Sequence, residues 1–276
     1  MNLENKALWC DLGIMPYSET SSLQEELAEL RKEGRISDLI LSVQHPAEVN
    51  FGTSSQDNLF SKEFLSEVSK ETGGNPSEEK IKEYLSARGV GFSKSGRGGG
   101  ATVLSPGQMV YYPIVNYEKI TGKPLGVGEY KAKIYRIMFE TLKSLGVDGI
   151  KITSDTPDAA LTDRNERKDI WLHVGGKPYK LGSKGLRMSG GVAYYGFSLY
   201  IDRNGTENFW IVNPCGYSHD EVGVTSAEEV TGRKISHRKV NDNARILFMK
   251  HFRYSSIENI PKEELLNIGK EENKYA

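Results

Sequence analysis

Hydrophobic residues recur along this chain with two periods, one typical of helices and one typical of strands. Where the period is helical, apolar residues return every three or four positions and would lie on one face. Ser22 and Glu25 have the spacing of a capping box at the start of the first such stretch. The pattern predicts helices at 22–33, 128–145 and 239–252, with two polar surface helices within 53–87.

Shorter apolar runs, bounded by glycine, proline or asparagine, predict strands instead. They lie at 38–43, 89–95, 108–115, 147–153, 170–174, 178–183 and 191–202. Strands in the middle with helices at both ends predict an α/β (α+β) fold with a mixed β-sheet core flanked by helices. Residues 154–169 are charged and lack periodicity, so we expect a mobile loop there and a frayed tail after 271, within a single domain spanning 1–276.

Composition narrows the class of protein. Hydrophobic residues make up 37% and charged residues 26% of the 276 positions, as in ordinary globular proteins. The 36 basic and 37 acidic residues nearly balance. This balance argues against binding of nucleic acid or an anionic membrane through the overall charge of the protein. The first residues are polar, and no window approaches the length of a membrane span. We therefore expect a cytoplasmic protein without an export signal.

The two cysteines, Cys10 and Cys215, lie far apart and lack the spacing of a zinc site, so no metal is expected. Cys215 stands between Pro214 and Gly216, which favour a tight turn that presents the thiol outward. A buried structural cysteine is the alternative interpretation of the same residue.

A nucleophilic thiol needs a group that stabilises the thiolate or takes its proton. His219 follows Cys215 by four residues, but its polar surroundings also suit a solvated surface histidine. Lys180 lies on a predicted strand and, if partly desolvated, would favour the thiolate or act as a base. By itself, a strand lysine is more often a surface residue with its head in water.

A glycine-rich loop precedes the second half of the predicted sheet. Arg97 begins it, and the glycines that follow let a backbone approach a ligand closely, while the guanidinium would suit a phosphate or carboxylate. The loop matches neither a Walker A motif nor a dinucleotide fingerprint, and a plain turn is the alternative. Gly190, Gly191 and Gly196 would leave room for a groove that holds a long flexible chain.

These segments occur in the order found in a known family. They are Leu41-Ser-Val-Gln-His45-Pro46, Arg97-Gly98-Gly99, Ser105-Pro-Gly-Gln108 with Tyr112-Pro113, Lys180-Leu-Gly-Ser183-Lys-Gly185-Leu-Arg187, Tyr195-Gly196-Phe197-Ser198-Leu199, Val212-Asn-Pro-Cys215-Gly-Tyr217 and Gly223-Val-Thr-Ser226. From about Tyr17 to Phe252, the sequence resembles the lipoyl(octanoyl) transferases. These enzymes move an octanoyl group from acyl carrier protein to a lysine of lipoyl domains.

The resemblance implies a cysteine-dependent acyltransferase, with Cys215 as the acyl-thioester nucleophile and Lys180 as the lysine that activates it. Its acyl-binding residues would be Arg97, Gly98, Gly99, Gly100, Ala101, Thr102, Val103, Leu104, Ser183, Lys184, Gly185, Gly196, Phe197 and Ser198. The implied fold is that of the biotin and lipoate protein ligases. The implied donor is acylated acyl carrier protein, and the acceptors are lipoyl domains of 2-oxoacid dehydrogenases or the glycine cleavage H protein. A monomer without metal or cofactor is expected, with no part for nucleic acid or membrane.

Two positions depart from the family pattern. Leu104 and Tyr195 stand where histidines are usual, and the run from Gly98 to Ala101 leans toward the related lipoate ligases. An ATP-dependent lipoate-protein ligase is therefore one alternative and predicts nucleotide binding. A non-catalytic module that binds acyl or lipoyl groups is the other, and the intact Cys215 and Lys180 weigh against it.

Overall fold

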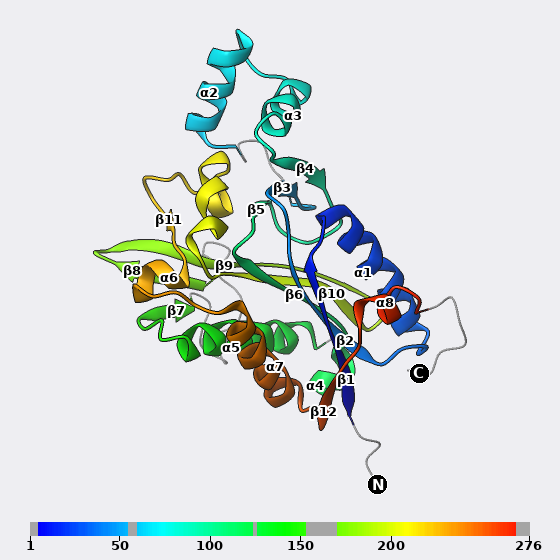
Figure 1. Cartoon of the computed structure of the whole chain (residues 1–276). Helices are drawn as coiled ribbons and strands as arrows, with labels where there is room; N and C mark the ends of the chain where they lie inside the picture. The colour runs from blue at the N-terminus through cyan, green and yellow to red at the C-terminus, as the bar shows by residue number, and fades with distance from the viewer. Residues whose placement is uncertain (1–4, 55–59, 124–125, 153–169, 269–276) are drawn as a thin grey trace.

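The computed structural model describes residues 5–54, 60–123, 126–152 and 170–268. Within these residues a mixed sheet of nine strands forms the centre of the molecule (Figure 1). In spatial order its strands are β12 (Ser256–Asn259), β1 (Lys6–Ile14), β2 (Asp38–Gln44), β6 (Gln108–Asn116), β10 (Val192–Tyr200), β9 (Lys177–Ser189), β8 (Ile170–Val174) and β7 (Ile150–Ile152), with β11 (Gly223–Val224) paired to β9. β1 runs parallel to β2 and β12, and β11 runs parallel to β9, whereas the pairs β2–β6, β6–β10, β10–β9, β9–β8 and β8–β7 are antiparallel.

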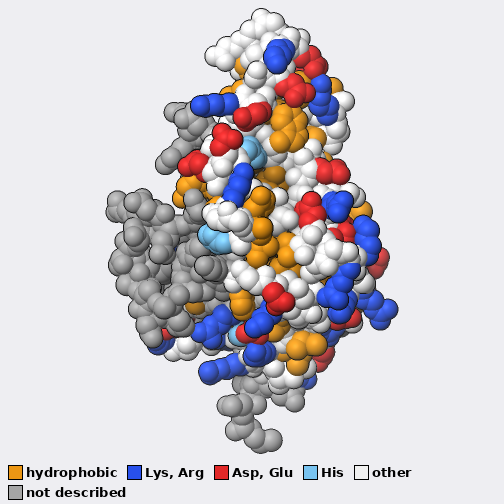
Figure 2. Space-filling view, turned by 90° about the vertical axis from the view of Figure 1, so that its left-hand side faces the viewer, with side chains coloured by type: hydrophobic (Ala, Val, Ile, Leu, Met, Phe, Trp, Pro, Cys, Tyr) orange, Lys and Arg blue, Asp and Glu red, His pale blue; other side chains and the backbone are white. Residues whose placement is uncertain are grey.

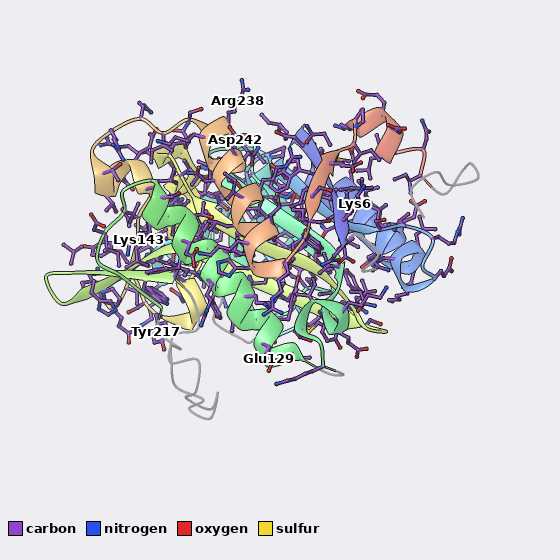
Figure 3. All side chains as sticks on the ribbon, turned by 90° about the horizontal axis from the view of Figure 1, so that it is seen from below. Lys6, Glu129, Lys143, Tyr217, Arg238 and Asp242 are labelled. Carbon is purple, nitrogen blue, oxygen red and sulfur yellow. The ribbon has the colours of Figure 1, made fainter. Side chains whose placement is uncertain are left out.

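Alternating side chains give this sheet two apolar faces, because successive residues of a strand point to opposite sides. In β1, Trp9 belongs to one hydrophobic cluster, whereas Leu8 and Cys10 belong to another. The paired helices α5 (Val127–Ser144) and α7 (His237–Phe252) cover the first face (Figures 1 and 3). The second face is covered by α1 (Tyr17–Lys32) and α8 (Lys262–Leu265). Two short helices, α4 (Tyr117–Thr121) and α6 (Ala227–Thr231), lie in the connections.

A small lobe stands at one end of the sheet, at the top of Figure 1. It contains a three-stranded sheet in the order β4 (Gly91–Lys94), β3 (Glu48–Phe51) and β5 (Ala101–Leu104), and the helices α2 (Lys62–Thr72) and α3 (Glu78–Ser86). The 3-10 helix η2 (Glu207–Ile211) packs against β5 and α2. Tyr200 at the end of β10 belongs to the same apolar cluster as Val103 of β5. The lobe is therefore joined to the main sheet at the ends of β10 and β5.

The predicted mixed sheet with flanking helices is confirmed. The strand β8 has the predicted bounds, 170–174. The helices predicted at 128–145 and 239–252 are α5 and α7, and each begins within two residues of its predicted start. The predicted strand at 178–183 is longer, because β9 continues to Ser189 and pairs with β10 along this length. The loop predicted at 154–169 and the tail after 271 lie outside the described residues.

The predicted capping box at Ser22 is wrong. α1 begins at Tyr17 with Pro16 as its N-cap, and the Ser22 hydroxyl donates to the carbonyl of Ser18 inside the helix. Tyr17 and Thr20 are buried, so the apolar face extends the helix toward the N-terminus past the polar Ser22.

Five of the described strands were not predicted, namely β1, β3, β5, β11 and β12. β3, β5 and β12 are each four residues long, too short for a period to stand out. Among the described residues no helix is long and apolar enough to cross a membrane.

Candidate active site

The glycine-rich loop between β4 and β5 is held by the side chain that begins it. Arg97 is buried, and its Nε donates to the side-chain oxygen of Asn50 at 2.5 Å. One guanidinium nitrogen, Nη2, donates to the carbonyls of Asn50 and Gly100, each at 2.8 Å. The guanidinium expected to meet a phosphate or carboxylate therefore engages the carbonyls of its own loop and of β3. Its effect is to fix the shape of the loop.

The same loop lies directly on the backbone of β9. The amide of Gly98 donates to the carbonyl of Leu186 at 3.3 Å, and a Cβ added at Gly98 would stand 2.9 Å from that oxygen. A Cβ at Gly185 would stand 2.9 Å from the carbonyl of Gly98. Contacts this short exclude any side chain. Glycine is therefore required on both sides of this contact for the loop to reach the main sheet.

The remaining glycines serve the sheet itself. A Cβ at Gly196 would stand 1.9 Å from the carbonyl of Tyr111 in the neighbouring strand. Gly190 and Gly191 have φ angles of 57° and 76° and form the tight turn between β9 and β10. Strand packing and turn geometry already require glycine at these three positions. Their glycines are therefore explained without the groove that we expected there.

The other predicted acyl-binding residues point in several directions. Phe197 packs in the cluster covered by α5 and α7, and the ammonium of Lys184 lies 4.8 Å from the ring centre of Tyr135 in α5. Ser198 is buried, and Ser183 shares a short hydrogen bond with Tyr200. The side chains of Phe197 and Lys184 therefore lie on the side of the sheet that α5 covers. The continuation of the loop, with Ala101, Thr102, Val103 and Leu104, forms β5.

Lys180 lies on β9 and is 5% exposed, as expected for a desolvated lysine. It pairs with Trp171 on one side and with Val224 of β11 on the other. Its carbonyl accepts from the amide of Thr225 at 3.0 Å, and its ammonium lies 5.9 Å from the centre of the Trp171 ring. Such a position over an indole face favours the charged form of a lysine.

Cys215 lies in the 3-10 turn η3 (Pro214–Gly216), as the flanking proline and glycine predict, and its side chain lies outside the described part of the structure. The amides of Gly216 and Tyr217 donate to the carbonyls of Asn213 and Pro214. η3 lies against β5, and the chain then continues to β11, which pairs with β9 at Lys180. The fold therefore draws the Cys215 turn, the glycine loop and the Lys180 strand to one end of the sheet. Hydrophobic side chains gather in the middle of the molecular face in Figure 2, below the small lobe.

His219 is not a free surface histidine. It is half-buried, and its Nε2 lies 3.0 Å from the carbonyl of Val212. No pattern in the sequence predicts this contact or the contacts made by Asn50 and Trp171. All three depend on which segments the fold brings together, and no local motif encodes them.

The two positions without the usual histidine lie in the cluster under α1. Leu104 is buried there, and Tyr195 is fully buried with an unusual φ of 55°. The hydroxyl of Tyr195 bonds with Ser21 at 3.0 Å and donates to Glu25 at 3.1 Å. Tyr195 therefore ties β10 to α1.

A separate hollow of about 740 Å³ lies near the start of α7. Its lining includes Asp11, Gln44, Asn241, Arg245 and Lys262, with Arg238 and Asp242. Figure 3 shows Arg238 and Asp242 on the opposite side of the view from Tyr217, which follows the Cys215 turn. The hollow is thus distinct from the candidate active site. Among the described residues no group of three or more histidine, cysteine or acidic side chains is arranged to hold a metal.

Known proteins resemble the chain in sequence and in fold. Residues 72–247 match the family model of the lipoyl protein ligase A/B catalytic domain. The octanoyltransferase of Alkaliphilus metalliredigens is 27% identical over 251 residues, which is 91% of this chain and 97% of that protein. The octanoyltransferase of Rubrobacter xylanophilus is 30% identical over 243 residues, or 85% of this chain and 90% of that protein.

The fold recurs in solved structures. A bi-partite lipoate protein ligase from Thermoplasma acidophilum superposes with a TM-score of 0.61 at 13% identity, covering 94% of this chain and 89% of that one. Lipoate-protein ligase A bound with ATP gives a TM-score of 0.61 at 13% identity, covering 95% and 91%. These findings confirm the predicted fold and the expectation of an acyltransferase enzyme. The chain belongs to the lipoyl protein ligase A/B catalytic domain family.

Proposed function

We propose that this chain is a cytoplasmic octanoyltransferase that moves an octanoyl or lipoyl group from acyl carrier protein to a lysine of a lipoyl domain. The acceptors would be the lipoyl domains of 2-oxoacid dehydrogenases or the glycine cleavage H protein, and Cys215 would carry the acyl group as a thioester. The relatives named octanoyltransferase support this activity. The observation that carries the proposal is the buried Lys180, whose backbone is bonded to the segment that follows the Cys215 turn.

In the first half of the reaction, the ammonium of Lys180 stabilises the thiolate of Cys215. The thiolate attacks the thioester carbonyl of the acylated carrier, and the bond between that carbonyl and the carrier sulfur breaks. The departing carrier thiolate takes a proton from Lys180. The enzyme is left with an acyl group on Cys215 and a neutral Lys180 amine.

In the second half, the neutral amine of the acceptor lysine attacks the Cys215 thioester. Lys180 accepts the proton that this nitrogen loses as the amide forms, and the Cys215 thiolate departs. The ammonium and thiolate are then restored together. Lys180 serves both halves because a desolvated lysine exchanges its proton more readily than one in water.

Mass spectrometry of the intact protein after incubation with octanoyl-carrier protein tests this proposal. We expect the mass to rise by one octanoyl group without ATP, and Cys215→Ser to abolish both the adduct and transfer to a lipoyl domain. Cys10→Ser is the matched control, because Cys10 is fully buried and burial raises the pKa of its thiol to about 12. That variant should acylate normally.

Other outcomes would identify the alternatives. Modification of a lipoyl domain only in the presence of ATP, magnesium and free lipoate would indicate a ligase, and binding of the acyl donor without turnover would indicate a non-catalytic module. Transfer by Cys215→Ser at a near-normal rate would rule out covalent catalysis at this residue.

A further inference from the structure

The segment that carries Cys215 is a loop closed at its base. The loop leaves the small lobe at Val212 and turns back at His219. Because a carbonyl oxygen only accepts hydrogen bonds, the 3.0 Å contact requires that His219 Nε2 carry a proton and donate it to Val212. Both the neutral Nε2–H form and the imidazolium donate in this way, so the bond does not depend on the charge of the ring.

Both sides of this closure are fixed to larger elements. Val212 is fully buried and forms an isolated β-bridge with Phe60, and the side-chain amide of Asn213 donates to the carbonyl of Phe60 at 3.1 Å. On the other side, the ammonium of Lys177 donates to the carbonyl of His219 at 2.7 Å. Lys177 begins β9, three residues before Lys180. The bond from His219 therefore connects the lobe side of the loop to the strand that carries Lys180.

We propose that His219 is a positioning residue: it holds the Cys215 turn against β9 through its bond to Val212 and carries no proton in the reaction. The inference rests on the proposed function for the role of Cys215. A closed loop keeps a nucleophile within reach of its partner, and a displacement of about 1 Å can slow an enzyme about a hundredfold.

Kinetics of octanoyl transfer by His219→Ala and His219→Gln test the proposal. The alanine variant loses the donor, so we expect kcat to fall about tenfold to a hundredfold with little change in KM for the donor. The glutamine side chain can donate from its amide nitrogen, so it should restore most of the rate, and its pH–rate profile should superimpose on that of the unaltered enzyme. A control is Ser218→Ala in the same loop, where the backbone amide still bonds to Glu221.

Hydrogen exchange supplies a readout that does not depend on activity. The amides of Gly216 and Tyr217 close the η3 turn, so they should exchange faster in His219→Ala and at the normal rate in His219→Gln. If His219→Ala does not fold, Lys177→Met can replace it, because this variant removes the bond from β9 to the carbonyl of His219. It should show the same fall in kcat and the same faster exchange of the Gly216 and Tyr217 amides.

Two results would overturn the inference. One is unchanged kcat and amide exchange in His219→Ala. The other is a glutamine variant as slow as the alanine variant with an altered pH profile, which would make His219 a proton carrier. If Cys215→Ser retained transfer, the proposed role of Cys215 would fail, yet the exchange of Gly216 and Tyr217 would still decide whether His219 closes the loop.

Discussion

At the scale of single residues, the surroundings of Lys180 bear on the role proposed for it beside Cys215. The side chain is buried beside the indole face of Trp171, and Val224 and Thr225 flank its backbone. Burial disfavours an ammonium ion, whereas an aromatic face favours it. At Lys180 these two effects oppose each other.

Lys180→Met should raise the apparent pKa for alkylation of Cys215 and slow acyl transfer. A free cysteine titrates near a pKa of about 8.5, and a nearby cation lowers that value. Lys180→Arg keeps the charge but cannot act as a base, so it should keep the thiol reactive and lose the second half-reaction. The rate of iodoacetamide labelling against pH in the three proteins measures the effect. An alkylation profile unmoved by Lys180→Met would contradict the pairing.

At the scale of elements, the contact between the glycine loop and β9 sets the position of β5 beside the Cys215 turn. Two hydrogen bonds hold the loop: the amide of Gly98 donates to the carbonyl of Leu186 in β9, and the guanidinium of Arg97 donates to the carbonyl of Gly100 within the loop. Asn50 holds the loop to β3, because its side-chain oxygen accepts from Arg97 and from Ser95. A buried network of this kind is rigid when every member has a partner.

Gly98→Ala should push the loop away from β9 and weaken the enzyme. The new methyl would stand 2.9 Å from a backbone oxygen that cannot move aside, which typically costs about 1–3 kcal/mol of stability. We expect kcat/KM for the octanoyl donor to fall about tenfold or more, because the loop borders the site. Gly91→Ala is the control, since its methyl meets only the flexible side chain of Glu48 at 3.2 Å. Equal kinetics in the two variants would show that the loop has no part in catalysis.

At the scale of the whole molecule, one buried histidine links stability to pH. His45 is fully buried; its Nδ1 donates to the carbonyl of Met15 at 2.7 Å, and its Nε2 accepts from the hydroxyl of Tyr112 at 2.8 Å. Burial lowers the pKa of His45 to about 4. The folded protein therefore holds this ring neutral where the unfolded chain would bind a proton.

Stability should fall as the pH drops from about 6.5, the ordinary histidine pKa, toward about 4. In this range the unfolded state binds more protons, and the contribution of His45 amounts to about 3 kcal/mol. His45→Gln can keep both hydrogen bonds without titrating, so its free energy of unfolding should depend less on pH. Urea unfolding at pH 7 and pH 4.5 measures both slopes. Identical slopes would assign the dependence to other groups.

The sequence by itself determined the mixed α/β class, the bounds of α5 and α7 to within two residues, the approximate positions of the central strands, and the order of the motifs. These follow from side-chain periodicity and from turn residues, which act over a few neighbouring positions. It also singled out Cys215 through the proline and glycine beside it, and Lys180 through the resemblance of its motif to a known family.

Only the tertiary structure decided what surrounds those residues. Trp171 stands opposite Lys180 because β8 pairs with β9, and His219 meets Val212 because the loop closes. The short strand β5 forms because β3 supplies its hydrogen bonds. The Arg97 side chain turns inward because the side-chain oxygen of Asn50 accepts a hydrogen bond from it. Such contacts join residues that are distant in the chain, and no local preference specifies them. Packing selects them when the sheet and the lobe come together.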